Sequence, residues 1–288
     1  MSNEVLDIDG ISLRGQGFGA STRTGRYSVP GVRGENLVLA GSSGSQFVRN
    51  KPFEEGAGSL SLWAIGATTS QTGERVLPPT MALRRAAFEE NMQTLMRLFT
   101  RPHRLSTIRT AQPDGSIRRA QVEWREWSEP EVQAGGTRAE WTISYTIPGV
   151  WWEDVSATTQ STPPSSNWPV LNLTNFAGMT GIIDDAQISV TGPVVNPRIQ
   201  DMETGQWVQY SGTVSAGQTW TVDCGAFTST LSGVNALANT THSGGFRFLT
   251  ISNCYGSNNY PRLQMVQGGS LGGTTSLSVT ARRKWVHG

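Results

Sequence analysis

Apolar and polar residues alternate along several short segments of the chain, and the clearest of these segments is 141–147. Its apolar positions are Trp141, Ile143, Tyr145 and Ile147, and threonine and serine separate them. Successive side chains of a strand point to opposite faces of its sheet, so a period of two places all four on one face. The pattern predicts an antiparallel strand with one buried face and one solvated face.

Weaker alternation predicts further strands on both sides of this segment. Glycine, proline and asparagine turns separate them at intervals that suit a mainly β fold, such as a sandwich or barrel in the second half. In the first half, the expected strands are 5–13, 36–39, 59–65, 105–111 and 116–124. In the second half, they are 187–190, 194–200, 206–213, 218–222, 246–251 and 276–281.

One segment changes to the period of an α-helix. Its apolar side chains recur at spacings of three and four residues, which places them on one helix face. Thr80 is a suitable N-cap, and the helix should end near Arg101, because Pro102 disfavours helical dihedral angles in the residue before it. We therefore predict a single helix near 80–101. Its apolar face consists of Phe88, Met92, Leu95 and Phe99.

Charged residues are distributed unevenly between two parts of the chain. Residues 1–155 hold 17 acidic and 17 basic side chains, whereas the rest of the chain holds five and six. The stretch 156–166 (SATTQSTPPSS) has no charge and no apolar periodicity. A stretch rich in Ser, Thr and Pro is typical of a linker or exposed connection. We expect an N-terminal domain at 1–155, a linker at 156–166 and an all-β C-terminal domain at 167–288.

The composition argues against several functional classes. A formal net charge of +1 gives no global attraction to nucleic acid or to an anionic membrane. No apolar run is long enough to span a bilayer and no signal peptide is recognisable, so synthesis in a cytoplasm without membrane insertion is expected. Cys224 and Cys254 are too few for a disulfide framework and lack CxxC spacing. The default expectation is two reduced, buried side chains.

No group of residues has the spacing of a catalytic or metal site. The three histidines are His103, His242 and His287, and no HExxH, CxxC or paired Cys/His pattern accompanies them. His103 follows the helix, where an imidazole can bond free carbonyls. His242 lies in a loop rich in Thr, Ser and Gly and leaves a hydrolase as a minor alternative. We expect no catalytic residue, no cofactor, no metal and therefore no enzyme.

Tryptophan is the residue type with the best potential for ligand contact, since its ring can stack on a sugar. Core packing and subunit interfaces use tryptophan as well. Trp124 and Trp141 lie on alternating apolar faces, so we expect them in the core. Trp207 follows a Thr-Gly turn and is expected to be exposed. It is the single candidate for a carbohydrate contact.

Several local sequences carry a family resemblance. In the first part they are 28–31 (SVPG), 41–44 (GSSG), 47–53 (FVRNKPF), 60–66 (LSLWAIG) and 143–153 (ISYTIPGVWWE). In the second part they are 192–199 (GPVVNPRI), 204–207 (TGQW), 217–223 (GQTWTVD) and 276–285 (SLSVTARRKW). With the order of the elements, they resemble the distal tail proteins of siphophages, in particular the minor tail proteins of phages that infect actinobacteria.

This resemblance implies an N-terminal β-sandwich or belt domain and a C-terminal galectin-like β-sandwich, with the last strand in that sandwich or packed on the first domain. It further implies a homohexameric ring at the virion tail tip, assembled in the host cytoplasm. One ring face would meet the tail tube protein, and the other would meet a baseplate or tail-associated hub protein. The alternative is a carbohydrate-binding or host-recognition protein (adhesin) of the tail, with a host cell-wall carbohydrate as its partner.

Overall fold

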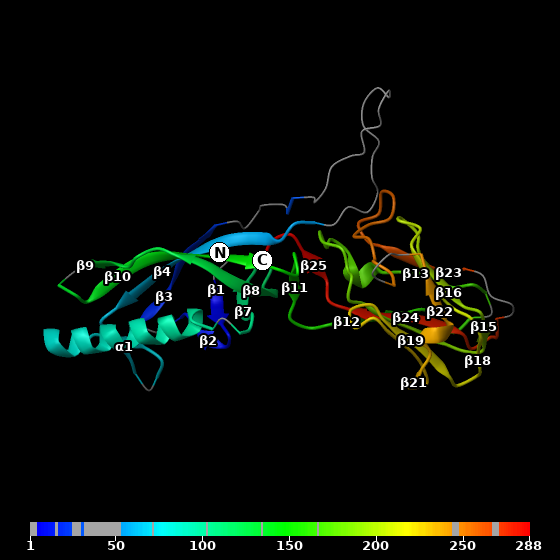
Figure 1. Cartoon of the computed structure of the whole chain (residues 1–288), viewed down its shortest axis with the longest axis horizontal. Helices are drawn as coiled ribbons and strands as arrows, with labels where there is room; N and C mark the ends of the chain where they lie inside the picture. Colours follow the sequence, from blue (N-terminus) through cyan, green and yellow to red (C-terminus); the bar gives the residue numbers. More distant parts are fainter. Residues whose placement is uncertain are drawn as a thin grey trace, which may run out of the picture. The chain divides into compact units, whose positions relative to one another are not determined.

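The structure is a computed structural model, in which the chain forms two compact units (Figure 1). Unit 1 comprises Met1–Glu153 and Val286–Gly288, and unit 2 comprises Asp154–Trp285. Within the described residues there is one α-helix, and β-strands form about half of the remainder. The predicted fold class, mainly β with one helix, is confirmed. The structure describes residues 5–14, 17–24, 30–31, 53–70, 72–101, 103–133, 135–165, 167–243, 248–266 and 271–288.

Unit 1 is built on one large sheet, in which the strand order is β2-β1-β7-β8-β10-β4-β3. The short strands β9 and β11 pair with β10 and β8 respectively, and β5 and β6 form a separate hairpin. The strands are β1 (Val5–Ile8), β2 (Ile11–Ser12), β3 (Phe18–Thr24), β4 (Gly56–Ile65), β5 (Thr68–Thr69), β6 (Arg75–Val76), β7 (Ser106–Ala111), β8 (Ile117–Trp127), β9 (Glu131–Gln133), β10 (Arg138–Ile147) and β11 (Trp152–Asp154).

The centre of this sheet is the antiparallel pair β4 and β10. The two strands stay in register from Arg138 opposite Ile65 to Ile147 opposite Gly56. Trp141 of β10 lies opposite Leu62 of β4, and both side chains are buried. The predicted strand at 141–147 is confirmed, because its four apolar positions are all buried and the intervening ones are exposed or half-buried.

The helix α1 (Met81–Phe99) ends two residues before the expected Arg101. Thr80 is its N-cap, as predicted, and the Thr80 hydroxyl accepts a hydrogen bond of 3.3 Å from the Leu83 N–H. The predicted apolar face is buried and lies along β4 and β3 (Figure 1). Such a face stabilises the helix by tertiary packing more than by intrinsic propensity.

An aromatic cluster fills the space at the end of this helix. The Phe99 ring meets Trp124 edge-on at 4.7 Å and Trp127 at 5.6 Å. Trp127 in turn stacks on Trp141 at 5.7 Å. The expectation that Trp141 is a core residue is confirmed, whereas Trp124 is half-buried and its indole N–H donates to the Ser106 hydroxyl at 3.0 Å.

Unit 2 consists mainly of two sheets. The six-stranded sheet has the order β12-β24-β14-β19-β20-β21, and the five-stranded sheet has the order β13-β23-β16-β17-β22. The six strands are β12 (Thr158–Ser161), β14 (Gln187–Thr191), β19 (Thr219–Asp223), β20 (Thr228–Leu231), β21 (Val234–Asn235) and β24 (Ser276–Ala281). The five are β13 (Val170–Asn172), β16 (Arg198–Asp201), β17 (Trp207–Tyr210), β22 (Thr240–His242) and β23 (Arg262–Val266).

The remaining elements of unit 2 are short. They are β15 (Val194–Val195), β18 (Thr213–Val214), β25 (Lys284–Trp285) and the 3-10 turns η1 (Thr174–Phe176) and η2 (Leu237–Asn239). One continuous core joins the inner faces of the two large sheets, with Trp220 and Val222 from the six-stranded sheet and Ile199 and Val208 from the five-stranded one. Two sheets that share one core form a sandwich, in which each sheet covers the apolar face of the other.

Several predicted segments differ from the structure. The stretch 156–166 was expected to be a linker, but it contains β12, which pairs with β24 and so belongs to the sheet of unit 2. In the predicted strand 246–251, the described part makes only an isolated bridge at Ile251, because Phe248 and Leu249 are both buried instead of alternating. The predicted strand 36–39 lies outside the described residues.

The end of the chain is divided between the two units. The long terminal strand β24 pairs with β14 and β12 inside unit 2. Residues Val286–Gly288 belong to unit 1, where Arg118 Nη1 donates to the His287 carbonyl at 2.7 Å. The strand β24 therefore lies in the sandwich of unit 2, and the three residues at the terminus belong to unit 1.

Candidate interaction surfaces

Buried carboxylates fix the first turn of unit 1. Asp7 accepts a hydrogen bond of 2.7 Å from Arg109. The Asp9 side chain is 6% exposed and contacts Arg101 and Arg104, each at 3.0 Å, while its second oxygen accepts from the Thr107 N–H at 2.8 Å. These contacts join the β1–β2 turn to the end of α1 and to β7. The carboxylates act as structural acceptors for arginine and backbone donors.

A cluster of exposed apolar side chains lies around the beginning of α1. Leu77 is 60% exposed and Leu83 is 53% exposed, and no nearby segment of the described chain covers them. Arg85 Nε donates to the Gly135 carbonyl at 3.0 Å, so the β9–β10 turn lies beside this end of the helix. Exposed apolar clusters often mark interaction sites. This surface, which we call the α1-start patch, consists of Val76, Leu77, Met81 and Leu83.

A run of exposed glutamates lies along the end of β8 and the start of β9 of the same unit. Arg125 is the one basic residue within the run, and it forms an ion pair of 2.9 Å with Glu123. The α1-start patch is flanked instead by Arg75 and Arg85. Unit 1 therefore presents two surfaces of different character. The second, which we call the acidic strip, consists of Glu123, Glu126, Glu129 and Glu131.

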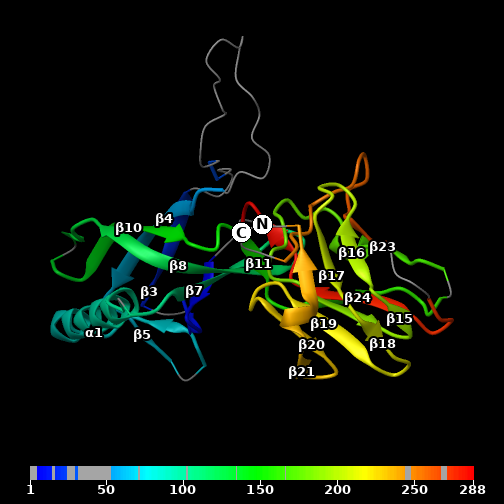
Figure 2. The same cartoon turned by 45° about the vertical axis from the view of Figure 1, so that its right-hand side comes forward.

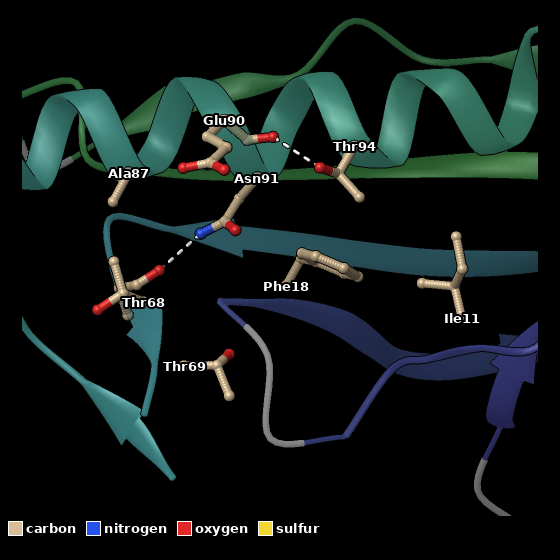
Figure 3. Close-up of a pocket in the computed structure, with 9 residues that line it drawn as sticks. Ile11, Phe18, Thr68, Thr69, Ala87, Glu90, Asn91 and Thr94 are labelled. Atoms are coloured by element: carbon tan, nitrogen blue, oxygen red, sulfur yellow. Dashed lines mark hydrogen bonds between the residues drawn. The ribbon is translucent and has the colours of Figure 1, made fainter. Parts of the chain in front are cut away.

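A pocket of about 420 Å³ lies between α1 and the strands beside it (Figure 3). Among the described residues that line it, Glu90 is the only ionisable one. The Asn91 amide donates to the carbonyls of Ile65 (2.9 Å) and Ala67 (2.8 Å), so its donors already hold the helix to the sheet. A single carboxylate without a second proton-transfer group does not make an acid–base site. The lining residues are Ile11, Phe18, Ala67, Thr68, Thr69, Ala87, Glu90, Asn91 and Thr94.

The histidines lie in different parts of the structure. His103 is exposed beyond α1, and His287 contributes its carbonyl to Arg118. The ring of His242, on β22, packs edge-on against Phe227 at 5.6 Å and Phe248 at 5.3 Å. Edge-on contact of this kind is a usual packing geometry of aromatic rings. Among the residues that the structure describes, no group of His, Cys, Asp or Glu is suited to hold a metal ion.

The two cysteines are free thiols in unit 2. Burial raises the pKa of the Cys224 thiol to about 12, and it raises the pKa of Cys254 in the same direction. A raised pKa keeps a thiol protonated and therefore poorly nucleophilic. Cys224 is buried, as expected, but Cys254 is only half-buried.

In the described part of the chain, no helix has the length and apolar character that a membrane crossing requires.

The carbohydrate candidate Trp207 is half-buried rather than exposed. The Arg198 guanidinium lies over its ring, 4.1 Å from the ring centroid, and covers one face of the indole. The sequence pattern did not reveal this contact, because Arg198 and Trp207 meet only through the register of β16 and β17. Trp168 is the exposed tryptophan of the chain, at 37%. The role of Trp207 in sugar binding stays a prediction.

Sequence comparisons identify no relative, since neither a protein-family model nor a curated protein matches the chain. Structural comparison, in contrast, does identify similar proteins. The fold matches the crystal structure of SPP1 Dit (gp 19.1), described as a paradigm of the hub adsorption apparatus in phages that infect Gram-positive bacteria. The TM-score is 0.60 at 11% identity, and the match covers 98% of this chain and 99% of that one. Both units thus share the fold of that protein.

Two further matches come from the phage P2 baseplate in its activated conformation. The calcium form has a TM-score of 0.40 at 8% identity and covers 100% of both chains. The strontium form has a TM-score of 0.38 at 7% identity and covers 97% of both chains. At these scores the likeness is too distant to support an argument of its own, and the fold assignment rests on the SPP1 protein.

Proposed function

We propose that this chain is the distal tail protein of a siphophage and serves as a structural hub of the tail tip, without enzymatic activity. The observation that supports this most is the fold likeness to SPP1 Dit, which extends over nearly all of both chains. The sequence resemblance to distal tail proteins was read from separate local patterns, so it supports the same assignment independently. Neither the fold likeness nor the sequence resemblance depends on a single motif.

The assembly we propose is a homohexameric ring in which unit 1 forms the contacts between neighbouring copies. A closed ring needs two different, complementary surfaces on each subunit. The α1-start patch, flanked by arginines, and the acidic strip have that relation, since one is apolar and basic and the other is acidic. Charge complementarity of this kind supplies register and specificity more than affinity.

The partners of this ring are the tail tube protein on one face and a baseplate or tail-associated protein on the other. Unit 2, with the galectin-like sandwich that the resemblance implies, would decorate the outside. A structural role agrees with the chemistry of the described residues, in which the carboxylates accept structural hydrogen bonds and the cysteines stay protonated. A ring subunit needs no poised acid–base pair and no cofactor.

The test is the mass of the purified protein in solution, measured by light scattering and native mass spectrometry. We expect a species of about six times the subunit mass of 31.1 kDa. The same protein should be found at the tail tip of purified virions by immunogold labelling. A monomer that persists at high protein concentration, together with absence from virions, would overturn the proposal.

A further inference from the structure

The outer face of the five-stranded sheet in unit 2 gathers amide, guanidinium and aromatic side chains. The strands β23, β16 and β17 lie next to one another in this sheet (Figure 2). Along each strand, buried inward positions alternate with half-buried outward ones. Its central outward residues, which we call the amide–arginine face, are Arg198, Gln200, Trp207, Gln209, Arg262 and Gln264.

Strand register aligns these residues in rows. Gln264 lies opposite Gln200, and Gln200 lies opposite Trp207. Because neighbouring strands are ~4.8 Å apart, this row extends about 10 Å across the sheet. In the next row, Arg198 lies opposite Gln209. The face is therefore a platform whose polar groups have the regular spacing of the strands, with an indole at one end of the first row.

Buried hydrogen bonds hold the aromatic end of this platform in place. Asp201 is fully buried and accepts from the N–H groups of Thr204 (2.8 Å) and Ser252 (3.0 Å), which fixes the turn before β17. The Gln206 side-chain oxygen accepts from the Thr250 hydroxyl at 2.6 Å. Trp207 follows directly, so its position is set by residues that point inward. A binding side chain held in this way loses little freedom when a ligand arrives.

Two donors on the same face have no acceptor. The Nε atoms of Arg198 and Arg262 are buried, and neither has a hydrogen-bond partner among the residues that the structure describes. The two guanidiniums lie over aromatic rings, Arg198 over Trp207 at 4.1 Å and Arg262 over Tyr255 at 5.0 Å. Buried polar groups are nearly always paired, and an unpaired one needs a specific reason. Because both atoms are buried, an oxygen-bearing ligand would supply the missing acceptor only if the guanidiniums shift when it binds.

The opposite outer surface of the sandwich shows what an ordinary solvated sheet looks like in this protein. On the six-stranded sheet, Ser189 contacts Thr221 at 3.2 Å and Thr191 contacts Thr219 at 3.3 Å. Hydroxyl pairs of this kind satisfy each other across strands. That face has no comparable arginine–tryptophan stack among its paired strands β14 and β19. The concentration of amide, guanidinium and indole groups is thus specific to one face.

We propose that the amide–arginine face binds a neutral, hydroxyl-rich polysaccharide of the host cell wall. A sugar ring offers an apolar C–H surface for Trp207 and oxygens that accept from Arg198. Glutamine amides both donate and accept, as sugar hydroxyls do, whereas an anion could use only donors. This binding function goes beyond the tail-hub role and does not depend on ring formation.

The experiment measures binding of the full-length protein to immobilised neutral wall polysaccharides, with wall teichoic acid as a phosphodiester polymer for comparison. We expect binding to at least one neutral polysaccharide. Trp207→Ala should weaken it at least tenfold, and Arg198→Lys, which keeps the charge but loses the guanidinium fork, should weaken it about tenfold. Gln264→Ala, a small change at an outward position, tests the same face if Trp207→Ala fails to fold.

Matched controls separate a specific site from general stickiness. Val234→Ala removes an exposed apolar side chain of the same unit on β21 of the other sheet, and Thr221→Ala alters the opposite sheet face. Both should bind as the unchanged protein does, and all variants should keep the same assembly mass. Three outcomes would overturn the proposal: no neutral polysaccharide bound at millimolar concentration, binding of teichoic acid alone, or binding unaffected by both Trp207→Ala and Gln264→Ala.

Discussion

Unit 1 covers part of its sheet with a helix, whereas the two sheets of unit 2 cover each other. The two units therefore differ in the number of large apolar side chains that remain exposed. Among the described residues, 12 large apolar side chains are exposed, of which eight belong to unit 1 and only four to unit 2. Unit 2 instead has a continuous core that receives side chains from both sheets. A sandwich completes its own burial, while a sheet with one helix leaves apolar surface for another molecule.

The charges follow the same division. In unit 1, ion pairs such as Arg119–Glu153 (2.8 Å) and Arg109–Asp7 (2.7 Å) connect strands. In unit 2, hydrogen bonds between hydroxyl groups connect neighbouring strands, as in the Ser189–Thr221 pair. These pairs connect strands within unit 1 itself. The larger number of exposed apolar side chains in unit 1 supports the proposal that this unit makes the assembly contacts.

The largest effect is expected from removing the centre of the unit 2 core. Trp220 is fully buried, and its indole N–H donates to the Ser229 hydroxyl at 2.9 Å. Trp220→Ala should lower the free energy of unfolding of unit 2 by about 3–5 kcal/mol, because it leaves a large cavity. Urea unfolding followed by near-UV circular dichroism measures this. Trp168→Ala is the exposed control and should cost less than about 1 kcal/mol.

If both tryptophan variants cost the same, the core of unit 2 does not dominate its stability. The self-sufficiency of unit 2 also predicts that Trp220→Ala leaves the assembly mass unchanged at temperatures where unit 1 stays folded. Loss of the assembly in the folded Trp220→Ala protein would mean that unit 2 takes part in subunit contacts.

The second prediction tests whether the exposed apolar residues of unit 1 form a subunit contact. The double variant Leu77→Asp, Leu83→Asp places two charges in the α1-start patch. We expect a loss of about 2–4 kcal/mol of association free energy per contact, because a charge buried in an interface needs a partner. Light scattering over a dilution series measures it. Val234→Asp, at a 70% exposed position in unit 2, is the matched control.

The double variant should unfold at the same urea concentration as the unchanged monomer, since both leucines are exposed. Equal association of the double variant and the Val234→Asp control would remove the α1-start patch from the assembly. In that case the acidic strip, tested by Glu126→Lys and Glu129→Lys, would remain as the other surface to examine.

A third comparison concerns two carboxylates that fix turns, one in each unit. Asp201 of unit 2 is fully buried and serves backbone donors at Thr204 and Ser252. Asp9 of unit 1 serves one backbone donor, at Thr107, and arginines that are 32% and 55% exposed. Asp201→Ala should cost about 3 kcal/mol, since buried donors lose their acceptor, whereas Asp9→Ala should cost about 1–2 kcal/mol because water can replace it. The urea midpoints of the two variants show which substitution costs more stability. A larger cost for Asp9→Ala than for Asp201→Ala would contradict this prediction.

The sequence predicts those elements best whose pattern is local. Thr80 was identified as an N-cap because the cap and the helical period adjoin in sequence, and the strand at 276–281 has the predicted limits because polar and apolar residues alternate throughout. The strand β22 was not predicted, since Thr240–His242 contains no apolar residue to mark a buried face. Its position depends on pairing with β17, which is far away in the sequence.

The candidate surfaces were less predictable for the same reason. Trp207 was identified by its turn, but its neighbours Arg198 and Gln200 come from another strand and become adjacent only when the register is known. For the stretch 156–166, the sequence predicts a linker where the structure has a strand. Its composition is that of an exposed connection, yet backbone pairing with β24 makes four of its residues an edge strand. Edge strands need little apolar character of their own.

The smallest effect is expected at alkaline pH, and it again separates the units. Burial raises the pKa of Cys224 from its ordinary value of 9.0 to about 12. The unfolded chain therefore loses this proton first, so stability is intact below pH 9 and declines as the pH rises toward 12. At pH 10 the loss should be about 1 kcal/mol, and Cys224→Ala should abolish it.

Unit 1 has its own alkaline group, which acts at higher pH. Burial raises the pKa of Tyr145 above its ordinary value of 10.0, although Arg23 opposes the shift. Its contribution is therefore intact below pH 10 and declines above it, and Tyr145→Phe should remove that decline. Urea midpoints at pH 8, 10 and 11 compare the two groups, because Cys224→Ala should change the difference between pH 8 and pH 10 more than Tyr145→Phe does. An equal difference in Cys224→Ala and the unchanged protein would mean that the thiol is as accessible in the folded unit as in the unfolded chain, and the core of unit 2 would then be less closed than its sandwich indicates.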